Sequence, residues 1–285
     1  MKALRSRTWR IGRERELILG PRGHLVGILN VTPDSFSDGG ADASVSEAVT
    51  RARRLVQDGA TVVDIGGEST RPGAEPVEIV EEIDRVVPVV RALALEGGSI
   101  VSIDTYRAET AAAALHAGAH IVNDVTGLLG DAEMAGVVSR NHAGLIAMHN
   151  SRKGVRPERE RDPVADQIAF ARELTARLDA AGIDHERVVF DPGIGFGKDA
   201  HENLHLLARL DELTSLEFPL LLGTSRKRFI GTVTERAVDA RDVGTAATTA
   251  LGRRAGAALF RVHDVAANRD ALRMADAIIE AGTVR

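Results

Sequence analysis

The chain has 285 residues, with 36 Lys or Arg against 41 Asp or Glu, so its net charge is −5. A slightly acidic chain with only 3% aromatic residues does not favour a nucleic-acid partner, because such proteins depend on basic surfaces and aromatic stacking. The absence of cysteine excludes disulfides, thiolate metal sites, iron–sulfur clusters and a cysteine nucleophile. This length allows one large barrel or two smaller domains.

The first twenty residues carry charges throughout and contain no continuous apolar core, which is not typical of a signal peptide. They precede the first long apolar run, so we expect a short β-hairpin or arm (residues 1–20) that covers the bottom of the fold. No run reaches the roughly 18 apolar residues of a membrane span. We therefore expect a cytoplasmic protein with no membrane partner.

Eight short apolar runs are spaced along the chain, and each ends in a polar residue. They do not alternate between apolar and polar positions, which indicates burial on both faces, as in the strands of a parallel sheet. The runs are LVGILN (25–30), TVVDIG (61–66), SIVSID (99–104), HIVND (120–124), GLIAMH (144–149), RVVFDPG (187–193), FPLLLGTS (218–225) and ALFRVHD (258–264).

Longer amphipathic stretches separate these runs and carry helix signals. Starts are indicated at Ser46 and at Asp162, which precedes a proline. Strands and helices in strict alternation predict an α/β fold, a (β/α)8 TIM barrel, as a single domain over residues 1–285. A doubly wound open sheet shares this alternation and is the alternative. The predicted helix stops are Gly59, Gly97, Gly118 and Gly182.

Polar side chains gather at the ends of the predicted strands. In a barrel these ends converge on one mouth, where active sites lie. An Asp or Asn after a strand often caps the next helix instead, but capping does not explain all eight ends together, nor Arg261 and His263. The strand-end residues are Asn30, Asp64, Asp104, Asn123, Asp124, His149, Asp191, Ser225, Lys227, Arg261 and His263.

Two loops, NVTPDSFSDGG (30–40) and GGESTRPGA (66–74), combine glycines with hydroxyl and carboxylate side chains. This composition suits contacts to an anion or a metal phosphate and a lid over the substrate. No phosphate-binding or dinucleotide-binding glycine motif is present. Lys227 could form a Schiff base, or it could join Ser225 and a helix N-terminus in an anion site.

Seven blocks in order resemble the dihydropteroate synthases, a family of pterin-binding barrels. The resemblance implies that p-aminobenzoate displaces pyrophosphate from 6-hydroxymethyl-7,8-dihydropterin diphosphate, giving 7,8-dihydropteroate for folate synthesis. It also implies Mg²⁺ as the cofactor, sulfonamides as competitors of p-aminobenzoate, and a homodimer. The blocks are GILNVTPDSFSDGG, DIGGESTRPGA, SIDTYRAE, IVNDV, FDPGIGFGK, GTSRKRFIG and RVHDV.

The resemblance assigns a pterin site to several of the strand ends. The carboxylate of Asp191 would accept the ring N–H and the 2-amino group, while Asn123 and Lys227 would bond the same ring. Asp104 would lie near the exocyclic methylene carbon and stabilise the positive charge that forms there. Met148, Phe196 and Gly223 complete the implied pterin-binding set.

The other substrate groups are assigned in the same way. The implied diphosphate-binding residues are Asn30 acting through Mg²⁺ as its metal ligand, Arg71, Arg261 and His263. The implied p-aminobenzoate-binding residues are Thr70, Arg71 and Pro72 in the second loop, with Ser225 receiving the carboxylate at a helix start. The catalytic set is Asp104, Arg71, Lys227, Arg261 and His263.

Three alternatives remain open: a catalytically silent pterin-binding paralogue, a methyltetrahydrofolate-binding methyltransferase barrel, and a Schiff-base aldolase that uses Lys227. The first two would not need the STRPG loop or the RVHD block, both of which this chain has. Asn150 stands where many members of the family have a second Met. The charged loop 150–162 has no assigned role.

Overall fold

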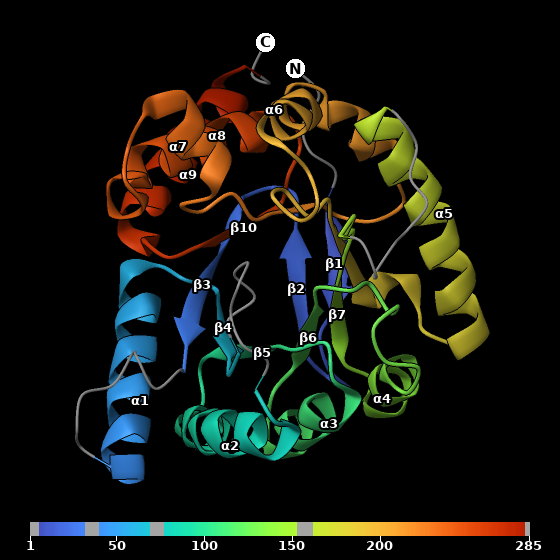
Figure 1. The fold of residues 1–285 in the computed structure, drawn as a ribbon, viewed down its shortest axis with the longest axis vertical. Helices are drawn as coiled ribbons and strands as arrows, with labels where there is room; N and C mark the ends of the chain where they lie inside the picture. The colour runs from blue at the N-terminus through green and yellow to red at the C-terminus, as the bar shows by residue number, and fades with distance from the viewer. Residues whose placement is uncertain (1–5, 32–39, 69–76, 153–161, 283–285) are drawn as a thin grey trace.

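Eight parallel strands form a nearly closed barrel in the computed structural model, which describes residues 6–31, 40–68, 77–152 and 162–282 (Figure 1). Neighbouring strands pair in the order β8-β7-β6-β5-β4-β3-β10-β9. A single bridge, Phe190 to Leu220, joins β8 to the start of β9 and brings the two edges together. The predicted TIM barrel is thus confirmed, and the open sheet is wrong. The strands are β3 (His24–Asn30), β4 (Val62–Gly66), β5 (Ile100–Asp104), β6 (Ile121–Asp124), β7 (Gly144–Met148), β8 (Val188–Asp191), β9 (Leu221–Leu222) and β10 (Leu259–Val262).

Helices surround the strands and pack their apolar faces against the outside of the barrel (Figure 1). None of the helices in the described ranges is both long enough and apolar enough to cross a membrane. Short 3₁₀ turns cover His185–Arg187, Leu210–Ser215 and Val238–Ala240. The helices are α1 (Gly40–Asp58), α2 (Ile79–Glu96), α3 (Ala108–Ala117), α4 (Met134–Asn141), α5 (Pro163–Ala181), α6 (Ala200–Ala208), α7 (Arg228–Thr234), α8 (Asp242–Arg254) and α9 (Val265–Ala281).

The helix boundaries follow the local signals at most points. The side chain of Asp162 caps α5 by accepting the N–H of Val164, and each predicted glycine directly follows its helix. Ser46 is the exception, because α1 already begins at Gly40. The two alanines before Ser46 favour helix, so this serine is an interior residue whose carbonyl accepts the Thr50 hydroxyl at 2.9 Å.

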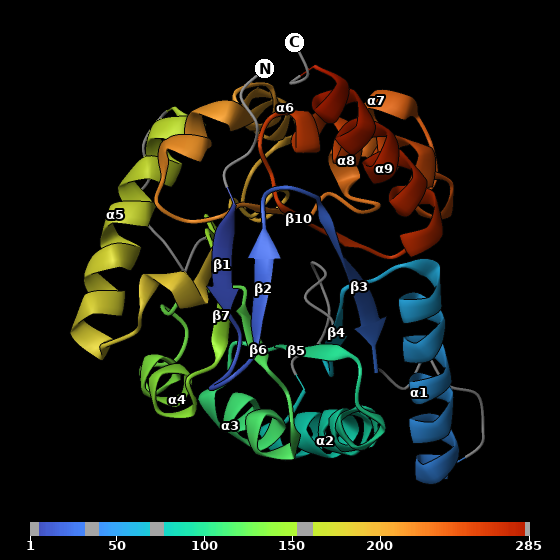
Figure 2. The ribbon, with the colours of Figure 1, turned by 180° about the vertical axis from the view of Figure 1, so that it is seen from behind.

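The N-terminal arm is the predicted hairpin, formed by β1 (Arg7–Arg10) and β2 (Glu16–Leu19) (Figure 2). Trp9, Ile11 and Leu19 are fully buried against apolar side chains inside the barrel. Ile11 also lies against Gly144, the first residue of β7, which places the hairpin at the N-terminal ends of the strands. This hairpin closes the bottom of the barrel, so ligands must enter at the opposite mouth.

Candidate active site

A cavity of about 990 Å³ opens where the strands end. It brings together every predicted site residue that the structure describes, from segments far apart in the chain. Thr70, Arg71 and Pro72 lie outside the described residues, as do parts of the loops 30–40, 66–74 and 150–162. The predicted residues that line the cavity are Asn30, Asp104, Asn123, Met148, Asp191, Phe196, Gly223, Ser225, Lys227, Arg261 and His263.

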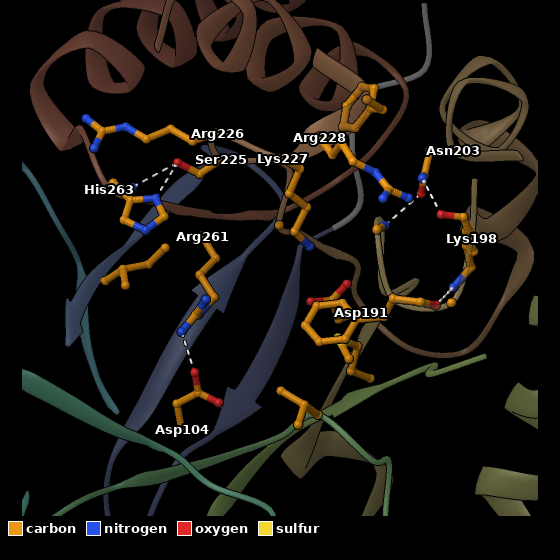
Figure 3. A pocket seen from close by; sticks show the side chains of 18 of the residues that line it. Asp104, Asp191, Lys198, Asn203, Ser225, Arg226, Lys227, Arg228, Arg261 and His263 are labelled. Atoms are coloured by element: carbon orange, nitrogen blue, oxygen red, sulfur yellow. Dashed lines mark hydrogen bonds and ion pairs between the residues drawn. The ribbon is translucent and has the colours of Figure 1, made fainter. Parts of the chain in front are cut away.

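The guanidinium of Arg261 is held by two carboxylates, Asp64 and Asp104, and Figure 3 shows its contact with Asp104. Its Nε donates to Asp64 Oδ2 at 2.6 Å, and its Nη2 donates to Asp104 Oδ2 at 2.6 Å. Burial alone would lower the pKa of Arg261, but the charges of Asp64 and Asp104 outweigh this effect and raise it. Arg261 is therefore a fixed cation whose orientation is set before any ligand arrives.

The two carboxylates retain unused hydrogen-bonding capacity. Burial raises the pKa of Asp104 to about 7, opposed by the charge of Arg261 and reinforced by the nearby carboxylate of Asp64. The Oδ1 atoms of Asp104 and Asp64 are buried, and neither accepts a hydrogen bond from the part of the chain that the structure describes. Buried acceptors without donors are costly, so the end of the cavity that Asp104 lines favours an incoming cation or N–H donor.

Two further groups of opposite charge, Asp191 and Lys227, line the cavity beside each other. Burial raises the pKa of Asp191, opposed by the charge of Lys227, and burial lowers the pKa of Lys227 to about 8. The ammonium of Lys227 donates to the Ile194 carbonyl and lies 4.7 Å from the centre of the Phe196 ring. A Cβ on Gly223 would lie 3.6 Å from Asp191 Oδ2 and would fill the space between the two charges.

Asn123 lines the cavity and bonds the same carboxylate that holds Arg261. Its side-chain N–H donates to Asp64 Oδ2 at 2.9 Å, the same oxygen that receives Arg261. Only 3% of Asn123 is exposed, and that surface faces the cavity beside Met148. The part of the cavity lined by Asn123, Asp191 and Lys227 thus offers hydrogen-bond donors and acceptors, and Met148 adds apolar atoms.

The structure corrects the expected environment of Ser225. The sequence predicts Ser225 at a helix start, but α7 begins at Arg228 and its N-cap is Lys227. The Ser225 hydroxyl instead accepts the backbone N–H of His263 at 3.1 Å and lies 2.9 Å from His263 Nδ1. Arg226 has a positive φ of 56° and pairs with Asp242. The side chains of Ser225 and Arg226 are therefore bonded to His263 and Asp242 and do not cap α7.

Several residues of the site went unnoticed in the sequence. Glu68 lines the cavity, and its carboxylate binds Arg107 at 2.8 Å and the Tyr106 hydroxyl at 3.0 Å. Lys198 and Asn203 line the cavity on the opposite side. In the sequence, Lys198 is indicated only as the last residue of the FDPGIGFGK block. No pattern indicates Asn203, which lies inside α6.

Comparisons with known proteins agree on one family. Residues 26–263 match the family described as pterin binding enzyme. The dihydropteroate synthase of Bacillus subtilis (strain 168) is 44% identical over 261 residues, covering 91% of this chain and 90% of the relative. A solved Xanthomonas albilineans dihydropteroate synthase with 4-aminobenzoic acid is 41% identical, with a TM-score of 0.90, and the match covers 99% of this chain and 100% of that one. A second structure from that organism, in complex with 7,8-dihydropteroate, is 40% identical, with a TM-score of 0.83 and coverage of 94% and 97%.

Proposed function

The chain belongs to the pterin-binding enzyme family, and we infer that it catalyses the dihydropteroate synthase reaction of folate synthesis. The amine of p-aminobenzoate replaces the diphosphate of 6-hydroxymethyl-7,8-dihydropterin diphosphate, and the products are 7,8-dihydropteroate and pyrophosphate. The observation that carries this function is one cavity in which the charged side chains of Asp191 and Lys227 lie across from Arg261, which Asp64 and Asp104 hold. The relatives named for this reaction cover nearly the whole chain.

The pterin ring takes the part of the cavity beside Asp191. A pterin presents two parallel N–H donors, and an ionised carboxylate accepts such a pair in a bidentate manner. Lys227 donates to the ring acceptors, and the amide of Asn123 bonds the ring from the opposite edge. Met148 and Phe196 supply the apolar surface against which an aromatic ring packs.

Bond breaking takes place between the pterin and the mouth. The C–O bond between the methylene carbon and the diphosphate breaks, its electron pair leaves with the diphosphate, and positive charge spreads into the pterin. Asp104, when ionised, stabilises this charge as it develops. The nitrogen lone pair of p-aminobenzoate then forms the new C–N bond, and the nitrogen releases its proton to water.

The leaving diphosphate meets cations at the mouth. Arg261 is already oriented by its two carboxylates, and it neutralises the charge that develops on the bridging oxygen. The Ser225 hydroxyl lies 2.9 Å from His263 Nδ1 and orients the imidazole, so a ring N–H of His263 can donate to a phosphate oxygen. Arg71 and Asn30 complete the diphosphate set, and Thr70 and Pro72 join Ser225 around p-aminobenzoate.

Magnesium fits this site as an ion carried by the substrate. The described residues contain no cluster of three or more His, Asp or Glu side chains that could hold a metal ion by itself. Mg²⁺ keeps several waters and binds substrate phosphates with one or two protein oxygens, and the Asn30 side chain at the cavity wall supplies such an oxygen. The bound ion would supply neutralising charge to the diphosphate.

The chain is also proposed to act as a cytoplasmic homodimer. Val233 on α7 and Val243 and Leu251 on α8 expose 61%, 84% and 67% of their surface, which provides apolar area for a second copy. Light scattering coupled to size exclusion gives the mass directly, and a monomer at micromolar concentration would contradict the dimer. Cell fractionation of the native host tests the location.

A steady-state assay of pyrophosphate release tests the proposed function. It uses the dihydropterin diphosphate and p-aminobenzoate, with and without Mg²⁺, and includes a sulfonamide as competitor. We expect release that depends on both substrates and that the sulfonamide inhibits competitively with p-aminobenzoate. Pterin binding without release would indicate the silent paralogue, and borohydride trapping of Lys227 with a carbonyl substrate would indicate the aldolase.

A further inference from the structure

Residues 192–198 follow β8, and we name this segment the glycine loop. It contacts the two charged groups proposed to bind the pterin, Asp191 and Lys227. Gly193, Gly195 and Gly197 have positive φ angles of 63°, 82° and 70°, so the backbone follows a path that other residues rarely adopt. A Cβ on Gly193 would lie 1.9 Å from the His149 carbonyl oxygen. The glycine loop therefore lies directly on the backbone that leaves β7.

The glycine loop orients the groups that would read the pterin. The Gly193 N–H donates to Asp191 Oδ1 at 2.7 Å, and the Ile194 carbonyl accepts the ammonium of Lys227. The ring of Phe196 lies 4.7 Å from the same ammonium. A change in the path of this loop would displace both Asp191 and Lys227 within the site.

Two buried side chains hold the glycine loop in place (Figure 3). The ammonium of Lys198, whose residue is only 5% exposed, donates to the Gly193 carbonyl at 3.0 Å. From α6, Asn203 accepts the Gly195 N–H at 2.7 Å and donates to the Lys198 carbonyl at 3.2 Å. Lys198 and Asn203 thus replace the regular backbone hydrogen bonds that this irregular segment lacks.

A buried chain of groups compensates the charge of Lys198. Its ammonium lies 3.0 Å from His149 Nδ1, and because an ammonium can only donate, Nδ1 must be the acceptor. The ring hydrogen therefore sits on Nε2, which lies 3.0 Å from the carboxylate of Asp166 on α5. Gln167 also contacts His149 Nδ1 at 3.0 Å, but within the described residues it makes no hydrogen bond to the glycine loop.

We propose that Lys198 is a positioning residue for pterin recognition, holding the glycine loop so that Asp191 and Lys227 meet the ring in the correct geometry. The inference rests on the proposed function, because it assumes that these two groups bind a pterin. It assigns to His149 and Asp166 the task of keeping a charged lysine buried behind the site. Lys198 then affects pterin affinity without reacting with the substrate.

The test compares Lys198→Met with the matched control Gln167→Met. Both variants remove a buried side chain that contacts the same nitrogen of His149, but only the first loses the bond to the Gly193 carbonyl. Binding of 6-hydroxymethyl-7,8-dihydropterin is measured by calorimetry, alongside KM for each substrate, kcat and Tm. We expect Lys198→Met to weaken pterin binding by about tenfold or more and to leave KM for p-aminobenzoate within about twofold.

Asn203→Leu provides a second, independent variant, because it releases the same loop from α6; it carries the test if Lys198→Met does not fold. It should reproduce the selective loss of pterin affinity, while Gln167→Met lowers Tm alone. Equal pterin affinity in all three variants and the wild type would overturn the inference while the proposed function stands. A wild-type protein that binds no pterin would overturn the proposed function and this inference together.

Discussion

The two ends of the barrel are built from the same strands but differ in whether their buried polar atoms have hydrogen-bond partners. At the bottom, the hairpin places Trp9, Ile11 and Leu19 against apolar side chains, and the indole N–H of Trp9 donates to the Arg187 carbonyl at 2.8 Å. At the mouth, the buried atoms are charged, and Asp64 Oδ1 and Asp104 Oδ1 find no donor among the described residues. One end is complete and the other is organised for a ligand.

Because of this difference, the bottom of the barrel contributes mainly to stability and the mouth contributes mainly to catalysis. Apolar burial at the bottom lowers the free energy of the folded state whatever the ligand or pH. The mouth holds several carboxylates at a cost, because burial disfavours their ionised forms. A ligand with N–H donors and a developing positive charge removes part of that cost. Variants at the bottom should therefore change stability, and variants at the mouth should change catalysis.

The largest expected effect is on stability, from Trp9→Ala. Trp9 is fully buried, so its truncation should lower the free energy of unfolding by about 4 kcal/mol through lost burial and a cavity. Urea unfolding measures this loss, and kcat of the folded fraction should stay within about twofold. Ile18→Ala on the same hairpin is the control, since Ile18 is 46% exposed. A large fall in kcat for Trp9→Ala would break the separation of the two ends.

Arg261→Ala should produce the largest effect on turnover. Removing a preorganised cation from the leaving group should lower kcat by roughly 10²- to 10³-fold. Binding of the free pterin alcohol should weaken much less, since that ligand carries no diphosphate. Calorimetry and steady-state kinetics give the two numbers. Arg10→Ala, which removes two exposed ion pairs at the bottom, is the control. Equal losses in turnover and in pterin binding would contradict the leaving-group role.

The pH dependence of kcat/KM for the dihydropterin diphosphate should report the two shifted groups in the mouth. The raised pKa of Asp104, about 7, means that activity falls toward tenfold per unit below pH 7 as the carboxylate takes up a proton. The lowered pKa of Lys227, about 8, means a second fall above pH 8 as the ammonium loses one.

The diphosphate of the substrate also titrates in mildly acidic solution. A control variant therefore separates its contribution to the acid limb of the pH profile from that of Asp104. Asp104→Asn should remove the acid limb that belongs to the protein and leave the alkaline limb in place. The raised pKa of Asp104 also makes the free energy of unfolding depend on pH. Protonated Asp104 favours the folded state at low pH, and this contribution is lost as pH rises through about 7. An acid limb unchanged in Asp104→Asn would assign it to the diphosphate.

The smallest expected effect is from Ser225→Ala. The variant loses one hydroxyl contact to the carboxylate of p-aminobenzoate and the bond to His263, so KM for p-aminobenzoate should rise by roughly fivefold. Pterin affinity and the free energy of unfolding should hardly change. A KM that stays the same would remove Ser225 from the p-aminobenzoate site.

Local sequence patterns determined the elements of the fold and the end of the barrel that carries the site. Buried strands need continuous apolar residues, and Gly59, Gly97, Gly118 and Gly182 end helices because glycine adopts the conformations that follow a helix. Parallel strands bring their C-terminal ends to one mouth, so strand-end residues could be grouped without coordinates. The hairpin at the bottom also followed from where the apolar runs began.

Only the tertiary structure decided which side chains pair with each other. Arg261 binds Asp64 from a position 197 residues away, Ser225 meets His263 rather than capping a helix, and Lys198 reaches across to His149. Strand register, barrel closure and side-chain rotamers fix these contacts, and none of them leaves a periodic signal in the sequence. The sequence therefore determined which groups share the mouth, and long-range packing decided which partner holds each group.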